Sequence, residues 1–162
     1  MCVNPLEPFW KIIHDIIEQP AVINMKMYIA HGDVNCLEHS LYVAYTSYRF
    51  AVKLGIDPTL ITRGAMLHDL YLYDWHIKGD RTGLHGFTHS KVALENAKAF
   101  FALSEIEEQI ILRHMWPLTW PAPTKKEAFI VSLCDKYCTT LETFKLQDRK
   151  TISDLMHPFN QK

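Results

Sequence analysis

Apolar residues recur at intervals of three and four positions along most of this chain of 162 residues. Leu41, Ala44, Tyr45 and Tyr48 follow this spacing, which places them on one face of an α-helix. No segment alternates apolar and polar residues over the length of a strand, and the chain has only six glycines. Hydrophobic residues make up 48% of the sequence, which is enough for one core at this length. We therefore expect a single all-α domain over residues 1–162.

Residues with capping preferences mark the ends of the predicted helices. Gly55 suits the end of one helix, and Asp57 with Pro58 suits the start of the next. Ser104 and Thr124 are each followed three residues later by a glutamate, which is the pattern of a capping box. The predicted helices span about residues 35–54, 57–73, 88–101, 105–115 and 125–146, after one or two helices over 5–28 that are interrupted near Gln19 and Pro20.

Charge and local composition limit the possible partners. Seventeen Lys and Arg residues against eighteen Asp and Glu residues give a formal charge of −1, which disfavours a nucleic-acid polymer as a partner. No run of apolar residues is long enough to span a membrane, and the first ten residues lack the regions of a signal peptide. The four cysteines form no CxxC pair, so we expect thiols. These features predict a soluble, cytoplasmic protein and leave the oligomeric state open.

Histidine and aspartate recur once in each predicted helix, next to apolar residues. One histidine in such a place is usually a hydrogen-bonded core residue, but five positions need five separate buried partners. A shared divalent metal would satisfy all of them, since neutral imidazole and carboxylate suit iron, manganese and zinc. The positions are His39, the adjacent pair His68 and Asp69, His89, His114, and Asp135.

The order His39, His68-Asp69, Asp135 resembles the H…HD…D signature of the HD superfamily of metal-dependent phosphohydrolases. The segments EHSLYVA, AMLHD and LCDKY are similar to the first, second and last motif helices of that family, and the resemblance covers about residues 31–142. It implies a compact helical bundle of about six or seven helices with a central metal site. It also implies that these four residues are ligands of one metal.

Two further histidines match the two-metal members of the family. His89 in HSKVALENA and His114 in ILRHMW imply a second ion, with Asp69 bridging both. The alternative is one ion, with His89 and His114 donating to a substrate phosphate. His85, four residues before His89, is either a third ligand or a loop histidine that contacts substrate or solvent. Iron or manganese is favoured for the ions, and zinc, nickel, cobalt or magnesium is possible.

The sequence departs from the family pattern at two places. Many HD hydrolases have a lysine three residues after the aspartate, where this chain has Leu72, so a common phosphate contact is absent. The motif around His114 has one histidine, which is followed by Met115, whereas the same motif of the similar cyclic-di-GMP phosphodiesterases has two histidines. Cyclic-di-GMP is therefore disfavoured as the substrate.

Other residues are candidates for contacts with substrate. Lys136 is the first choice for the missing cation, because it follows the predicted ligand Asp135 directly. Arg113 next to His114 is a second candidate, and His31 is predicted to line the entrance or to lie in an ordinary turn. Lys78 and Arg81 are further candidates in the loop over 76–87.

The resemblance predicts a metal-dependent phosphohydrolase for a nucleotide or another small phosphate ester. Asp69 and Lys136 are the expected catalytic residues, and a metal-activated water is the expected nucleophile. Two alternatives remain open: a diiron oxygenase of the HD type, and an inactive sensor that binds metal or nucleotide. The aromatic residues Tyr71, Trp75, Trp116 and Trp120 are predicted either to stack on a base or to pack within the protein.

Overall fold

The computed structural model describes residues 6–77 and 83–160. Helices dominate this part of the chain, so the all-α prediction is confirmed. The elements in order are α1 (Glu7–Ile17), α2 (Pro20–Ile23), the 3-10 helix η1 (Asn24–Met27), β1 (Ile29–His31), β2 (Val34–Asn35), α3 (Cys36–Lys53), α4 (Thr59–Leu67), α5 (His85–Phe100), α6 (Glu105–Arg113), α7 (Lys126–Thr143) and α8 (Arg149–Asn160).

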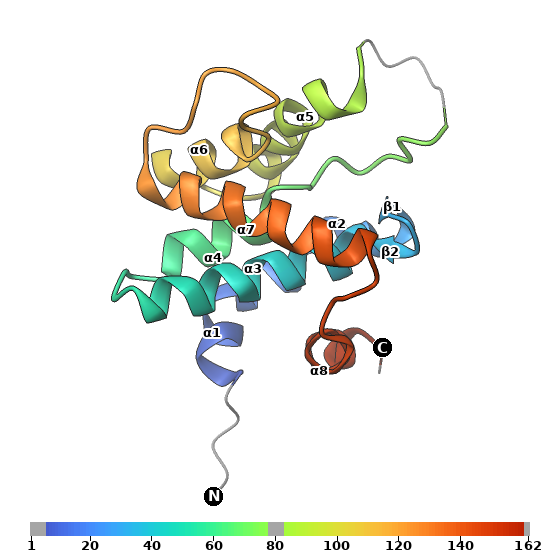
Figure 1. Ribbon diagram of the computed structural model, residues 1–162, viewed down its shortest axis with the longest axis vertical. Coiled ribbons are helices and arrows are strands. Elements are labelled where there is room, and N and C mark those ends of the chain that lie inside the picture. The colour runs from blue at the N-terminus through green and yellow to red at the C-terminus, as the bar shows by residue number, and fades with distance from the viewer. Residues whose placement is uncertain (1–5, 78–82, 161–162) are drawn as a thin grey trace, which may run out of the picture.

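The helices pack around one core that surrounds α4 and α7. The helix α3 packs against α4, α7 and α8, while α6 packs against α4, α5 and α7. Figure 1 shows α7 crossing the molecule between the pair α3–α4 and the pair α5–α6. Leu41, Leu67, Ile110 and Val131 contribute fully buried side chains from four of these helices. Residues far apart in the sequence therefore meet in the middle of the bundle.

Local capping explains why several helices begin and end where the sequence predicts. The Oδ1 atom of Asn35 accepts a hydrogen bond from the backbone N–H of Glu38, at 3.0 Å, and starts α3. Gly55 has a φ of +69°, a left-handed conformation that ends this helix at little steric cost. Both reciprocal hydrogen bonds of the predicted capping box join Ser104 and Glu107 at the start of α6.

The predicted helix over 57–73 is too long, because α4 ends at Leu67. The next two residues form a turn, in which the backbone N–H of Tyr71 donates to the carbonyl of Asp69 at 2.8 Å. Leu72 then has a φ of +53°, which no α-helix contains. The apolar pattern continues past Leu67 because Leu70 and Tyr71 are buried in the core from an irregular segment. His68 and Asp69 therefore lie beyond the last helical turn.

The predicted capping box of Thr124 and Glu127 is wrong. The helix α7 begins at Lys126, and no side chain caps its first turn. The hydroxyl of Thr124 instead donates to Oε1 of Gln109 at 2.9 Å, so a contact with α6 replaces the local cap.

Three other features differ from the sequence prediction. His85 was expected before its helix, but it is the first residue of α5. The helix α8 and the short antiparallel hairpin of β1 and β2 were not predicted.

None of the helices in the described part of the chain has the length and apolar character needed to cross a membrane.

Candidate metal centre

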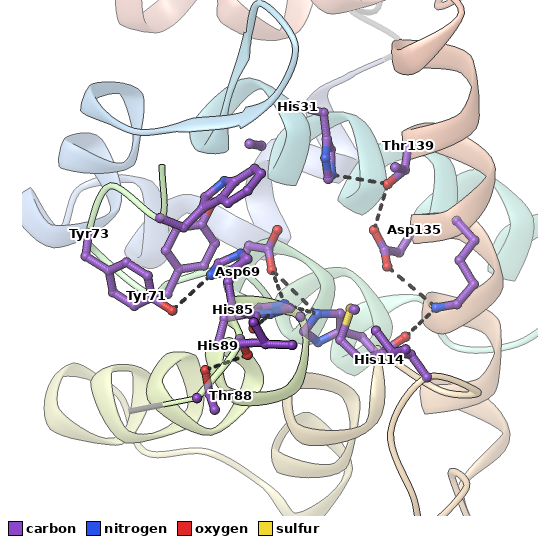
Figure 2. A pocket seen from close by; sticks show the side chains of 18 of the residues that line it. His31, Asp69, Tyr71, Tyr73, His85, Thr88, His89, His114, Asp135 and Thr139 are labelled. Atoms are coloured by element: carbon purple, nitrogen blue, oxygen red, sulfur yellow. Dashed lines mark hydrogen bonds and ion pairs between the residues drawn. The ribbon is translucent and has the colours of Figure 1, made fainter. Parts of the chain in front are cut away.

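Five elements bring the predicted histidines and aspartates together in the centre of the bundle. His39 comes from α3, His89 from α5 and Asp135 from α7, while three residues directly follow helices: His68 and Asp69 after α4 and His114 after α6. All six side chains are buried. Their ligand atoms form overlapping groups of three, in which the members lie within 4.8 Å of one another. Figure 2 shows that Asp69, His89 and His114 converge, with Asp135 nearby.

The two oxygens of Asp69 face two different sets of donors. Its Oδ2 atom lies 3.8 Å from Nε2 of His39 and 3.6 Å from Nε2 of His68. Its Oδ1 atom lies 3.3 Å from Nε2 of His89 and 3.5 Å from Nε2 of His114. Asp135 joins the first set, because its Oδ1 atom lies 3.2 Å from Nε2 of His39 and 3.7 Å from Nε2 of His68. The arrangement is that of a carboxylate shared by two groups of ligands.

Backbone hydrogen bonds orient three of the histidines. His68 and His114 follow the last residues of α4 and α6, where carbonyl groups lack helical partners. Nδ1 of His68 donates to the carbonyl of Ala65 at 2.7 Å, and Nδ1 of His114 donates to the carbonyl of Ile111 at 2.8 Å. Nδ1 of His89 donates in the same way to the carbonyl of His85, at 2.8 Å. A carbonyl can only accept, so in a neutral ring the proton is on Nδ1 and the Nε2 lone pair faces Asp69.

A buried glutamate orients the fourth histidine. Nδ1 of His39 donates to Oε2 of Glu142 at 2.7 Å, and both side chains are inaccessible to solvent. Glu142 was not predicted from the sequence. It follows Asp135 by seven residues, so both point from the same face of α7, and this spacing is the signal that could have identified it.

Several site atoms lack the partners that buried polar atoms need. Nε2 of His68 and Oδ1 of Asp69 are buried without a hydrogen-bond partner in the described structure. Nε2 of His89 lies only 2.9 Å from Nε2 of His114, so two lone pairs face each other when both rings are neutral. A proton or a cation between these atoms removes the repulsion. The donor set therefore fits divalent metal ions, which imidazole and carboxylate ligands suit.

Electrostatics of the cluster keep the carboxylates charged. Burial favours the neutral form of Asp69, but His68 and His89 hold its pKa well below the usual range. Asp135 has a pKa that is also well below the usual range, because the nearby His39 and His68 outweigh the effect of burial. Burial, with the neighbouring His68 and His89, lowers the pKa of His114 to about 3. The site thus presents anionic carboxylates and a neutral His114. Burial lowers the pKa values of His39 and His89, but Asp135 and Glu142 raise that of His39 and Asp69 raises that of His89, so metal binding displaces protons from these two rings.

A cavity of about 1110 Å³ opens above this cluster. Asp69, His89, His114 and Asp135 belong to its lining, so the candidate metal ligands form part of its wall. Its size suits a drug-sized or nucleotide-sized ligand. The predicted substrate contacts Lys136 and His31 also line it. Arg113 is not part of this lining, and Lys78 and Arg81 lie outside the described residues.

Lys136 is held by the end of α6. Its Nζ atom donates to the carbonyl of His114 at 2.7 Å and to the carbonyl of Ser132 at 3.2 Å. The same atom lies 3.8 Å from Oδ2 of Asp135. Burial lowers the pKa of Lys136 from its ordinary value. The ammonium group therefore has a fixed position beside both the candidate ligand Asp135 and the cavity.

His85 is not in any of the groups of ligand atoms that include the six central residues. Its Nδ1 atom is 3.0 Å from the hydroxyl of Tyr73, and its ring stacks on His89 with centroids 4.4 Å apart. Its carbonyl accepts the hydrogen bond from His89 described above. His85 therefore lies in the cavity wall beside His89, at the start of α5 and not in a loop.

A family model described as the HD domain matches residues 36–140, which is well over half of the chain. The chain belongs to the HD domain family. Ribonuclease Y of Clostridium novyi (strain NT) is 35% identical over 81 residues, which are 49% of this chain and 14% of that relative. Ribonuclease Y of Clostridium tetani (strain Massachusetts / E88) is 32% identical over 81 residues, with the same two shares. The matched segment is thus a small fraction of the length of these two relatives.

The fold also resembles a solved HD domain. The crystal structure of the L. monocytogenes phosphodiesterase PgpH HD domain in complex with cyclic-di-AMP aligns with a TM-score of 0.52. The alignment covers 95% of this chain and 81% of that chain, at 16% sequence identity. An identity this low shows the fold alone. The structural similarity and the family match thus agree on an HD-domain fold.

Proposed function

We propose that this HD domain hydrolyses a nucleotide or another small phosphate ester with two divalent ions. The observation that carries the proposal is the division of the Asp69 carboxylate, whose Oδ2 atom faces His39 and His68 and whose Oδ1 atom faces His89 and His114. Asp135 would complete the first ligand set. Iron or manganese suits this mixture of imidazole and carboxylate ligands best.

Bound divalent ions lower the pKa of a coordinated water and neutralise charge on phosphoryl oxygens. The protein contributes orientation, because each histidine is fixed through Nδ1 by a carbonyl or by Glu142. It also contributes a cationic group, since the Nζ atom of Lys136 is held at the cavity wall by the carbonyl of His114. Lys136 thereby supplies positive charge for a phosphate, in place of the lysine that is absent after Asp69.

His31 and Lys136 lie near different oxygens of Asp135: Lys136 approaches Oδ2, whereas Thr139 links His31 to Oδ1. The Nε2 atom of His31 is 3.4 Å from the hydroxyl of Thr139, which is in turn 3.4 Å from Oδ1 of Asp135. Figure 2 shows this series of three side chains at the cavity. His31 is therefore placed to bind a polar group of the substrate, and its pKa is lowered chiefly by burial, which favours the neutral ring.

The test is phosphate release by the full chain after reconstitution with Mn²⁺ or Fe²⁺, using a panel of nucleotides and sugar phosphates. We expect hydrolysis by the wild type and none by Asp69→Asn, which keeps the shape of the side chain and removes its charge. Asp154→Asn, at an exposed position of α8, is the matched control and should retain full activity.

The two alternatives give different results in the same assay. An oxygenase of the HD type consumes oxygen in the presence of iron and substrate, so an oxygen electrode detects it. A sensor binds nucleotide without releasing phosphate. Either result with fully metal-loaded protein would contradict the proposed hydrolysis.

A further inference from the structure

The carboxylates and the lysine of the described cavity lining all lie at the candidate metal cluster. They are Asp69, Asp135 and Lys136, whose Nζ atom is 3.8 Å from Oδ2 of Asp135. Other parts of the lining come from the segment after Asp69, the start of α5 and the segment after α6. A phosphate ester with its phosphate at the cluster therefore meets these three segments with its organic part.

The aromatic residues of the segment after Asp69 use their polar atoms within the protein. The hydroxyl of Tyr73 is 3.0 Å from Nδ1 of His85, a contact that Figure 2 shows, and Nε1 of Trp75 donates to the carbonyl of Ile29 at 3.0 Å. The Trp75 ring already stacks on His76 and on His85, with centroids 3.9 and 5.1 Å apart. Tyr73 and Trp75 therefore offer a ligand mainly the carbon atoms of their rings.

Two threonine hydroxyls of the lining donate to backbone carbonyls. Oγ1 of Thr88 donates to the carbonyl of Leu84 at 3.1 Å, and Oγ1 of Thr140 donates to the carbonyl of Lys136 at 2.7 Å. A hydroxyl has only one proton to donate. Neither threonine can therefore donate to a ligand while these hydrogen bonds are present.

Leucine side chains add apolar surface to the same cavity. Leu84 and Leu118 both line it, and they are 73% and 50% exposed. A Cβ atom at Gly86 would lie 3.3 Å from Cδ2 of Leu118 and 4.0 Å from Cε of Met115, so the start of α5 lies close to the segment after α6. Leu84, Met115, Leu118 and the ring carbons of Tyr73 and Trp75 form what we call the apolar side of the cavity. A ligand that covers the exposed leucines removes apolar surface from water, which favours binding.

We infer that the phosphate ester bound here carries an aliphatic group, which contacts the apolar side of the cavity while the phosphate lies at the candidate metal cluster and Lys136. This inference rests on the proposed function and selects, among small phosphate esters, alkyl phosphates and similar amphiphilic esters. A sugar or a nucleobase would place several polar groups against side chains whose N–H and O–H groups already have partners, and burial of unpaired polar groups is costly. An aliphatic chain has no such groups and gains free energy from burial.

A series of alkylphosphonates of increasing length tests the inference. In ethyl-, butyl- and hexylphosphonate the chain is joined to phosphorus through carbon, so there is no ester bond to hydrolyse. Isothermal titration calorimetry of each with the Mn²⁺-loaded full chain measures binding without turnover. Complete burial of one methylene group increases an affinity about fourfold. We expect hexylphosphonate to bind at least about tenfold more tightly than ethylphosphonate, because partial burial of four methylene groups suffices for this ratio.

Matched variants locate the effect on the apolar side. Leu118→Asn should lower the affinity ratio of hexyl- to ethylphosphonate at least about threefold, whereas Leu133→Asn should leave it unchanged. These leucines are 50% and 53% exposed, and only Leu118 lines the cavity. Leu84→Asn and Leu146→Asn form a second pair, at positions that are 73% and 71% exposed, and only Leu84 lines the cavity. Leu84 is the N-cap residue of α5, a position that asparagine suits, so this variant should fold.

The outcomes distinguish this inference from the proposed function. Equal affinities for the three alkylphosphonates, or no binding of hexylphosphonate, would overturn the inference even if nucleotides are hydrolysed. Tighter binding of the phosphonate analogue of AMP than of hexylphosphonate would also overturn it, as would a ratio that falls equally in the cavity variants and in their controls. Length-dependent binding without phosphate release from hexyl phosphate would support the aliphatic subsite and contradict the proposed hydrolysis.

Discussion

The Oε2 atom of Glu142 lies 2.7 Å from Nδ1 of His39, in a part of the core where neither side chain is accessible to solvent. The other three histidines of the cluster donate from Nδ1 to backbone carbonyls. His39 lies inside the long helix α3 and donates to a carboxylate from α7 instead. A carboxylate that accepts a hydrogen bond from a ligating histidine fixes the tautomer of the ring and increases its basicity. Glu142 would therefore set the orientation and basicity of His39 without itself binding a metal ion.

Replacement of Glu142 tests this positioning role. We expect Glu142→Ala to weaken metal affinity about 10- to 100-fold, as loss of such outer partners usually does. Glu142→Gln should weaken it less, because the amide oxygen can still accept from Nδ1. Metal titration of the purified chain, followed by elemental analysis, measures both effects. Glu95→Ala, at an exposed position of α5, is the control, and equal affinities in all four proteins would contradict the role.

The division of the site around Asp69 predicts two ions for each chain. His89 and His114 face the Oδ1 atom of Asp69, so their joint replacement by alanine should remove one ligand set and preserve the other. After full reconstitution, elemental analysis should find two metals in the wild type and about one in the double variant. One metal in both proteins would show that these histidines have another role, such as donation to phosphate.

Lys136→Met tests the cation at the cavity wall, because methionine keeps much of the side-chain volume and lacks the charge. We expect weaker binding of a phosphate ester with unchanged metal content, since no protein ligand is removed. The salt dependence of binding should also fall. Loss of metal from the variant would show instead that the hydrogen bond from Lys136 to the carbonyl of His114 chiefly supports the ligand His114.

Much of the site could be predicted because its residues occur in a characteristic order along the sequence. His39, the pair His68 and Asp69, and Asp135 each stand beside an apolar segment, and burial of those segments brings the four residues into one core. His89 and His114 were predicted from the same family pattern, and the structure places them around the second oxygen of Asp69. The sequence was informative here because the candidate metal ligands lie on or directly after helices whose apolar residues form the core.

Features that depend on tertiary partners could not be predicted in this way. The apolar pattern predicts too late an end for α4, because buried Leu70 and Tyr71 continue the helical period in an irregular segment. The sequence around Thr124 matches a capping box, but it does not reveal that the hydrogen-bond partner of Thr124 is Gln109 on another helix. Arg113 was a reasonable neighbour of His114 in the sequence, but adjacent residues on a helix point in different directions, and the cavity lining does not include it.

The close contact between α4 and α6 leads to a prediction about stability. A Cβ atom at Gly64 would lie 2.7 Å from Cδ1 of Ile110 and 2.9 Å from its Cβ, so Gly64→Ala forces two packed helices apart. Such overpacking costs about 1–3 kcal/mol, which outweighs the gain of about 1 kcal/mol in helix propensity. Urea denaturation should show a lower free energy of unfolding. In combination with Ile110→Val, the loss should be less than the sum of the two single losses.

A second stability prediction concerns pH, and it rests on the contact between α1 and α4. Both terminal nitrogens of Arg63 donate to Asp15, at 2.6 and 3.0 Å, and this pair lowers the pKa of Asp15. A carboxylate with a lowered pKa stabilises the folded state above its unfolded pKa of about 3.9, and this contribution disappears as the pH falls through the folded pKa.

Asp15→Asn should therefore lower the free energy of unfolding at pH 6 by roughly 0.2–1 kcal/mol, since Asp15 is mostly exposed to solvent. At a pH below the lowered pKa of Asp15 the difference between variant and wild type should largely disappear, because the wild-type carboxylate is then mostly protonated. Urea denaturation of metal-free protein at both pH values measures the two differences. The same substitution in an Arg63→Gln background should have little effect at pH 6. An equal loss in that background would show that Asp15 stabilises the fold through a contact other than Arg63.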